Sequence, residues 1–389
     1  MTKVEKQIAE FLIKNKNLLF FAVITVMGAY LRFYGLPLIT SDMEGFLLPW
    51  YYEILDKGGL QALGSQVGDY GLLYQTILAG LTYINWNPVY LIKFLPLIFD
   101  FLLCIMVPYF FCQITKKEIL GFEYNIIYTL LMFLPTFVIN SAYWGQSDSI
   151  YSLFVLLTLF SIYKGEYKRS AVYYGLAFAF KLQAIFILPF IIAYYFYSKR
   201  MSARNALITL FVFWGSGIIA FFNGRSLAAP FTIYAMQSDE HAFMFMNFPS
   251  AWMLVGYDYY IFKTMAIVVA LAALGIGLFI VLSKKVSIDS FEDFLKICAW
   301  FIWTALIFMP SMHDRYAYYL DIILILLCVL NRKYIKYASV SLIMSTLAYC
   351  DYLFYTGYIN IYSAVVYLAA YLAFTFCQCF KFEKTELSV

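Results

Sequence analysis

Charged residues are scarce in this 389-residue sequence: they make up 13% of it, whereas hydrophobic residues make up 63%. Soluble domains average about 25% charged and about 45–50% apolar residues. The mean hydropathy of +0.77 comes from many long apolar runs rather than one, so the bilayer is the solvent of this chain. The sequence therefore predicts an all-α, polytopic transmembrane bundle. It excludes a transmembrane β-barrel, whose strands would show short alternating segments.

The sequence also has few histidines, a small net charge and no cysteine spacing typical of a zinc site. The chain has only two histidines, His241 and His313, which argues against a histidine-based catalytic triad or a multi-histidine metal site. The net charge of +4 does not suggest a nucleic-acid partner. The seven cysteines lie in or beside apolar runs without zinc-like spacing, so we expect buried thiols and neither disulfides nor a metal. They are Cys104, Cys112, Cys298, Cys328, Cys350, Cys377 and Cys379.

Apolar segments long enough to cross the bilayer, at about 20 residues per crossing, recur along the whole chain. No cleavable signal is expected, because the first 17 residues are polar and the first apolar run is long enough to span. The stretch 171–197 could be one long helix or two short passes that meet at Lys181. We expect one membrane domain, 1–389, with about 11–13 spans. The unambiguous segments are 18–36, 88–112, 121–141, 149–163, 205–222, 259–283, 294–310, 316–331, 335–351 and 359–380.

The basic clusters predict the orientation of the chain. Under the positive-inside rule they share the cytoplasmic face if residues 70–86 do not cross the membrane. The outer face then receives a first loop, 37–86, which contains juxtamembrane helices, and a second loop, 223–250. It also receives the turn 144–148, Lys181 and residues 313–315. The clusters are Lys3/Lys6/Lys14/Lys16, Lys116/Lys117, Lys164/Lys168/Arg169, Lys199/Arg200/Arg204, Lys284/Lys285, Arg332/Lys333/Lys336 and Lys381/Lys384.

Two carboxylates, Asp42 and Glu44, open the first outer loop. Residues two apart do not share a helical face, so they would serve different partners. One of them could be a general base at the membrane surface, where partial desolvation raises the pKa of a carboxyl group. The alternative is that Asp42 caps a helix and Glu44 faces solvent.

The turn from Trp144 to Asp148 reads Trp-Gly-Gln-Ser-Asp. Asp148 or Ser147 could cap the following helix. Capping does not explain why a tryptophan and Gln146 share the same turn. That composition suits stacking on a sugar ring and hydrogen bonding to a sugar or pyrophosphate.

Cations follow in two further places. Lys181 lies between apolar residues, and a charge at membrane depth is costly unless it is paired or hydrated, so it indicates function unless it snorkels to the interface. His313 and Arg315 stand two residues apart at the start of an apolar run. Because Arg offers a planar fork and His a second donor, this pair suits a phosphate.

Five motifs in this order resemble the GT-C superfamily of polytopic glycosyltransferases, and in particular the bacterial relatives of the glycolipid-anchor mannosyltransferases. They are the acidic pair Asp42 and Glu44, the turn 144–148, Phe-Lys-Leu-Gln at 180–183, Asn-Phe-Pro-Ser-Ala-Trp at 247–252, and Met-His-Asp-Arg-Tyr at 312–316. The spacing of the acidic pair departs from the adjacent acidic residues of some branches.

The resemblance implies a cell-membrane transferase whose active site faces outside. It would move a sugar from a polyprenyl-phosphate monosaccharide to a glycan, lipid or polymer acceptor, with inversion. The positions that match the base of these enzymes are Asp42 and Glu44, either of which could serve; we assign Asp42 as base and Glu44 as second acidic residue. Arg315, His313 and Lys181 would bind the donor phosphate. Asp148, Gln146, Trp144 and Trp252 would contact the sugar or the acceptor.

Other functions remain open from the sequence. A transporter or flippase of lipid-linked sugars would share a charged outer cavity, although the chain lacks the paired halves typical of such proteins. An acyl- or phosphotransferase would call for a histidine base or an acidic metal cluster. A non-catalytic subunit of a cell-envelope assembly is a further alternative. No cofactor is required, but a divalent metal could bridge Asp42 and Asp148.

Overall fold

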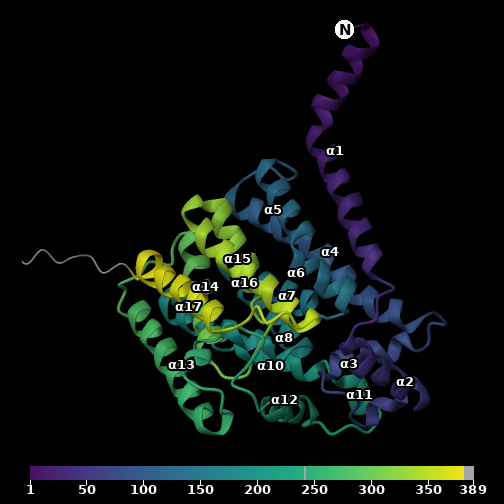
Figure 1. Ribbon diagram of the computed structural model, residues 1–389, viewed down its shortest axis with the longest axis vertical. Coiled ribbons are helices and arrows are strands. Elements are labelled where there is room, and N and C mark those ends of the chain that lie inside the picture. Colours follow the sequence, from purple (N-terminus) through teal and green to yellow (C-terminus); the bar gives the residue numbers. More distant parts are fainter. Residues whose placement is uncertain (241, 381–389) are drawn as a thin grey trace, which may run out of the picture.

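The computed structural model describes residues 1–240 and 242–380, and this part of the chain is almost entirely helical (Figure 1). The predicted basic residues Lys381 and Lys384 lie outside the described residues. Four helices are long and apolar enough to cross a membrane: α1 (Lys3–Gly35), α4 (Pro88–Thr115), α13 (Tyr259–Leu282) and the segment Ile361–Cys379, which joins α17 (Ile361–Phe374) to η7 (Thr375–Cys379). These helices are consistent with a multi-pass membrane protein.

A fifth candidate span is bent. Phe122–Phe133 (α5) and Pro135–Trp144, which contains α6 (Pro135–Val138) and the π-helix η3 (Ile139–Trp144), meet at 54°. The bend has a local cause, because Pro135 disfavours a helical backbone at Leu134, which is extended. The predicted segment 121–141 is therefore a broken helix.

Other predicted spans are short helices. At 1.5 Å per residue, the 16 residues of α7 (Asp148–Tyr163) rise about 24 Å, less than the roughly 30 Å hydrocarbon core. The helix that could continue through 171–197 is interrupted at Lys181, whose backbone is extended, in agreement with the two-segment interpretation. The remaining short helices are α8 (Tyr167–Phe180), η4 (Leu182–Ile187), α9 (Leu188–Ser198), α10 (Asn205–Gly215) and α15 (Tyr318–Leu330).

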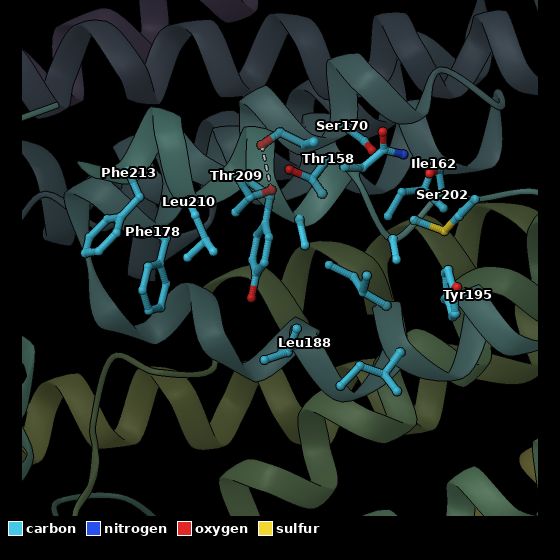
Figure 2. A pocket seen from close by; sticks show the side chains of 18 of the residues that line it. Thr158, Ile162, Ser170, Phe178, Leu188, Tyr195, Ser202, Thr209, Leu210 and Phe213 are labelled. Carbon is cyan, nitrogen blue, oxygen red and sulfur yellow. Dashed lines mark hydrogen bonds between the residues drawn. The ribbon is translucent and has the colours of Figure 1, made fainter. Parts of the chain in front are cut away.

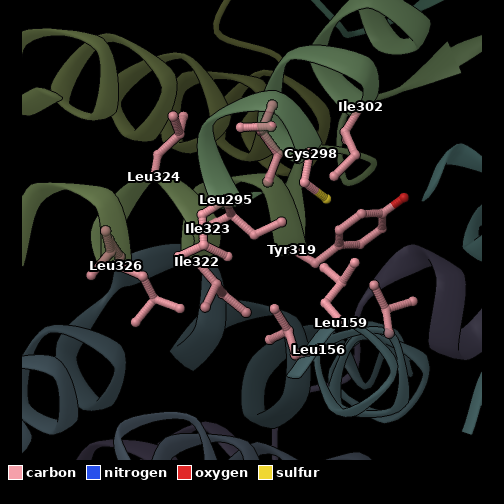
Figure 3. Close-up of a cluster of buried hydrophobic side chains, with 14 of the residues drawn as sticks. Leu156, Leu159, Leu295, Cys298, Ile302, Tyr319, Ile322, Ile323, Leu324 and Leu326 are labelled. Atoms are coloured by element: carbon pink, nitrogen blue, oxygen red, sulfur yellow. The ribbon is translucent and has the colours of Figure 1, made fainter. Parts of the chain in front are cut away.

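The core is built by α7, α14 (Phe291–Phe308) and α15, whose side chains are buried along most of their length. Figure 3 shows Leu156 and Leu159 of α7 facing Cys298 of α14 and Ile322 and Tyr319 of α15. Because protein surrounds these helices, their length need not match the bilayer. By contrast, α1 extends away from the body of the molecule (Figure 1), and much of its apolar surface is exposed.

The first predicted outer loop folds into short helices. They are η1 (Met43–Leu47), α2 (Leu48–Asp56), η2 (Gly59–Gly64) and α3 (Leu72–Leu81). Together with α11 (Ile218–Phe222) and α12 (Ala229–Glu240) they form one side of the molecule (Figure 1). The ten residues of α3 rise about 15 Å, half the hydrocarbon thickness.

A two-stranded parallel sheet joins the second predicted outer loop to the segment before α15. Strand β1 (Phe245–Met246) pairs with β2 (Met312–His313), with Met246 opposite His313. The short helix η5 (Ala251–Leu254) follows β1. In the described part of the chain, α15 is followed by η6 (Arg332–Tyr334), α16 (Ile335–Phe354), α17 and η7. This pairing places Phe245 and Met246, which directly precede the motif at 247–252, beside Met312 and His313, although the two segments are far apart in the sequence.

Candidate functional site

Asp42 is buried at the start of η1 and accepts three hydrogen bonds. Trp144 Nε1 and Gln146 Nε2 donate to Oδ2 at 2.9 Å and 2.7 Å. The hydroxyl of Tyr352, from α16, donates to Oδ1. A carboxylate has about four lone-pair positions, so one acceptor position on Oδ1 is left for a further donor.

Gly145 allows the turn to approach Asp42 closely. Its backbone is left-handed, with φ at +79°, and a Cβ there would lie 2.5 Å from the Met43 methyl group. Glycine alone adopts this conformation without strain and without that clash. The turn predicted from composition is thus positioned against the acidic loop by its glycine.

Lys93 of α4 contacts both the segment that precedes Asp42 and the residue that precedes Trp144. Its fully buried ammonium donates to the carbonyl oxygens of Gly35 at 3.1 Å, Leu38 at 2.5 Å and Tyr143 at 2.8 Å. The first two carbonyls precede Asp42 and the third precedes Trp144. Lys93 is therefore a positioning residue for the carboxylate and its donors.

Gln146 connects the carboxylate to a cation. Its amide nitrogen donates to Asp42, while its Oε1 accepts from Arg315 at 2.5 Å and from the Tyr70 hydroxyl at 2.9 Å. A carboxylate on one side and a guanidinium on the other fix the orientation of the amide. Tyr70 lies outside the candidate spans, and burial raises the pKa of its hydroxyl well above the usual value, so it remains a donor.

Asp148 holds two cations together. It accepts from Lys181 Nζ at 2.7 Å and from Asn140 Nδ2 at 2.7 Å, and Arg315 Nη1 lies 3.7 Å from its second oxygen. Lys181 reaches it because the extended backbone between α8 and η4 turns the chain at the end of the helix. We infer that Asp148 orients Lys181 and Arg315, a role that differs from the predicted contact with a sugar.

The third predicted cation, His313, lies beside this group. Its Nδ1 is 3.3 Å from Asp314 Oδ1, and Arg315 Nε donates to the same oxygen at 3.3 Å. The carboxylate of Asp314 is almost fully buried. His313 and Arg315 are thus coupled through the residue between them.

Two predicted site residues do not join this network. Glu44 is exposed on η1, because residues two apart in a helical backbone point in different directions. Trp252 is buried in a separate cluster with Met244 and Tyr259, and its indole donates to the Phe308 carbonyl at 2.7 Å. Of the two predicted carboxylates, Asp42 alone lies in the network, and Trp252 packs in a separate cluster.

Trp144 joins the network in a way that the sequence did not predict. It is fully buried, its ring stacks on Tyr352 at 4.9 Å, and the Arg315 guanidinium carbon lies 5.1 Å from its centroid. A ring that is already covered in this way cannot stack on a sugar. The predicted stacking role is wrong for this arrangement, and the indole instead donates to Asp42.

The predicted metal bridge between Asp42 and Asp148 has no support in this geometry. Three neutral donors occupy Asp42, whereas Lys181, Asn140 and Arg315 surround Asp148. Cations beside a carboxylate oppose the binding of a divalent ion. In the described part of the chain, no group of three His, Cys, Asp or Glu residues is placed to hold a metal.

Arg32, a basic residue in the last turn of α1, has a structural partner. Its guanidinium makes a bidentate pair with Asp100 at 2.8 Å and 3.1 Å and donates to the Met132 carbonyl at 2.7 Å. Ser141 completes the carboxylate at 2.6 Å. This fully buried group joins α1, α4, α5 and η3, so Arg32 is not available for a phosphate.

An apolar cavity of about 510 Å³ lies among α7, α8, α9 and α10. Figure 2 shows Phe178, Leu188, Leu210 and Phe213 around it. Phe178 stands three residues before Lys181 on the same chain segment, so the cavity and the buried cation share α8.

Three residues of the network were not predicted, and the sequence marks them to different degrees. Asn140 is a polar residue in an apolar run, four residues before Trp144 of the recognised turn, and could have been chosen. Tyr352 is one of 36 tyrosines and comes from α16, so nothing local marks it. Tyr70 lies in the first outer loop but carries no motif.

Neither the protein-family models nor the curated proteins compared with this sequence match it.

Proposed function

We propose that the protein is an integral membrane glycosyltransferase that takes its sugar from a polyprenyl-phosphate monosaccharide. The observation that carries the proposal is the Asp42–Gln146–Arg315 chain, in which one amide links a buried carboxylate to a guanidinium. A base and a phosphate-binding cation are thereby held at a fixed separation. The order of motifs that resembles the GT-C superfamily supports the same conclusion, as do the short helices of the first outer loop.

Asp42 is the base in the proposed reaction. Its remaining acceptor position takes the proton of an acceptor hydroxyl, and that oxygen attacks C1 of the donor sugar from the side opposite the phosphate. The C1–O bond to phosphate breaks, and the bonding electrons leave with polyprenyl phosphate. The product is an inverted glycoside. Trp144, Gln146 and Tyr352 hold the carboxylate in one orientation for the proton transfer.

Arg315 and Lys181 stabilise the negative charge that develops on the departing phosphate. Both cations are already oriented by Asp148, so they need little reorganisation during the reaction. His313 is the further donor, coupled to Arg315 through Asp314. The apolar cavity beside α8 suits the hydrocarbon chain of the donor, because its lining is almost entirely carbon. In the proposed orientation the site faces the outer leaflet.

The test is transfer by the full-length protein purified in detergent or nanodiscs. It is incubated with a panel of polyprenyl-phosphate sugars and candidate acceptors, and release of polyprenyl phosphate is measured. We expect Asp42→Asn to lower the rate by on the order of a hundredfold or more. Glu44→Gln, two residues away and exposed, is the matched control and should retain the rate.

Equal rates for wild type and Asp42→Asn would overturn the role of Asp42. If no donor is turned over while lipid-linked sugars are moved across a proteoliposome membrane, the protein is a transporter instead.

A further inference from the structure

A second cavity, of about 890 Å³, lies between the first outer loop and α12. Its volume is within the range of about 300–1,000 Å³ that is typical of small-molecule sites. The first loop contributes Phe46, Trp50, Gln66, Gly68 and Asp69. Helix α12 contributes Thr232, Ile233, Ala235, Met236 and Gln237. The apolar cavity of Figure 2 is lined by other helices, so the two are separate sites.

Trp50 is a rigid aromatic wall of this cavity. Gly68, at φ +66°, lies so close to the indole that a Cβ there would be 2.5 Å from ring atoms. The Tyr70 ring meets Trp50 at 5.3 Å between centroids, edge to face, and Phe46 lies 6.0 Å away. An aromatic ring held by its neighbours binds a ligand with little loss of conformational freedom.

The polar groups of the cavity are also held in place. Gln66 donates to the Gly68 carbonyl at 2.5 Å and accepts from Arg225. Gln237 of α12 donates to the Asp69 carbonyl, which ties α12 to the first loop. Gln66, Asp69 and Gln237 therefore line a cavity that also presents Trp50.

This lining selects one class of ligand. The amides of Gln66 and Gln237 disfavour a purely hydrocarbon chain. Carbohydrate hydroxyls both donate and accept hydrogen bonds, which matches the amide groups. The apolar face of a sugar ring matches an aromatic wall.

The cavity is connected to the candidate base. Tyr70 follows Asp69, packs against Trp50, and donates to Gln146, which in turn donates to Asp42. Only one tyrosine and one amide thus separate the aromatic wall from the carboxylate. A ligand in the cavity would lie on the first-loop side of Asp42.

We propose that this cavity binds the carbohydrate portion of the acceptor, with Trp50 as the stacking surface and Gln66 and Gln237 as hydroxyl partners. The proposal rests on the proposed glycosyltransferase function and adds the acceptor class and its place. The sugar could belong to a free oligosaccharide or to a glycolipid, since the ring chemistry is the same.

The experiment measures binding separately from transfer. Full-length protein in nanodiscs is titrated with free gluco-, manno- and galacto-di- and trisaccharides, and with the same sugars on a short alkyl chain. Saturation-transfer NMR reports which sugar binds. We expect Trp50→Ala and Gln237→Ala each to weaken binding roughly tenfold or more. Trp86→Ala is the matched control, because Trp86 is an exposed tryptophan of the same loop, outside the cavity.

The outcomes separate the two proposals. Binding that is weakened by both cavity variants, retained in Trp86→Ala and retained in Asp42→Asn supports the acceptor site, even if no donor is ever turned over. Equal binding by wild type and both cavity variants overturns it, as does an absence of binding by every sugar of the panel. Stronger binding of the alkyl-linked sugars would identify a glycolipid acceptor, and equal binding a free glycan.

Discussion

The pair between Lys181 and Asp148 yields the sharpest prediction, because both side chains are almost fully buried and only 2.7 Å separates Nζ from Oδ1. Removal of one partner from a buried ion pair costs about 3–5 kcal/mol of unfolding free energy. Lys181→Met leaves Asp148 with Asn140 at 2.7 Å and Arg315 at 3.7 Å, so we expect the low end, about 3 kcal/mol.

Asp148→Asn should cost more, about 5 kcal/mol, because it leaves Lys181 and Arg315 facing each other without their shared carboxylate. In the double variant neither the lone carboxylate nor the lysine remains, and we expect a loss of about 5 kcal/mol rather than the sum of the two single losses. The coupling energy is then about 3 kcal/mol, at the upper end for contacting residues.

The assay is equilibrium unfolding in mixed micelles, followed by tryptophan fluorescence for all variants. Lys57→Met is the control, since it breaks an ion pair with Glu53 of nearly the same length, 2.6 Å, whose side chains are more than two-fifths exposed. Its effect should stay within about 1 kcal/mol. Additive losses in the double variant, or a Lys181→Met effect no larger than that of Lys57→Met, would refute the reasoning.

Three further predictions follow from single positions. Lys93→Met should lower the unfolding free energy by about 3 kcal/mol, because it removes the hydrogen-bond donor of three buried carbonyl oxygens. No measurable change in the same unfolding assay would exclude the positioning role of Lys93. Gly145→Ala should reduce transfer more than stability, because a side chain at this left-handed position, φ +79°, strains the turn that carries Gln146; equal transfer rates would contradict this. Cysteine introduced at exposed Trp86 should label from outside in a Cys377→Ser background, whereas cysteine at exposed Lys117 should not; labelling of both from one side would overturn the orientation.

Local chemistry explains which parts of the site were predictable. A carboxylate after an apolar run, a tryptophan-glycine turn and a lysine within an apolar stretch are unusual in themselves, so Asp42, Gln146 and Lys181 were identified. The break at Lys181 followed from its charge. Roles were less predictable, because Trp144 was expected to stack on a sugar and is instead covered by Tyr352 and Arg315.

Whether an apolar helix faces lipid or protein could not be predicted from the sequence either. Apolar runs such as 149–163 and 316–331 satisfy a hydropathy criterion whether they face lipid or protein. The structure buries α7 and α15 within the bundle, where other helices satisfy their apolar surface and no fixed length is imposed. Sequence alone cannot distinguish these two environments.

The sequence by itself determined that the chain is apolar enough for a bilayer, that it is helical, and which polar residues are unusual, because each depends on local composition and on the cost of charge in an apolar medium. Only the tertiary structure decided which of these polar residues contact one another. Asp42 and Tyr352 are separated by 310 residues. Asp148 lies beside both Lys181, which follows α8, and Arg315, which precedes α15. Hydrogen bonds of fixed length between distant segments depend on how the helices pack, and that packing sets which of two neighbouring carboxylates is buried.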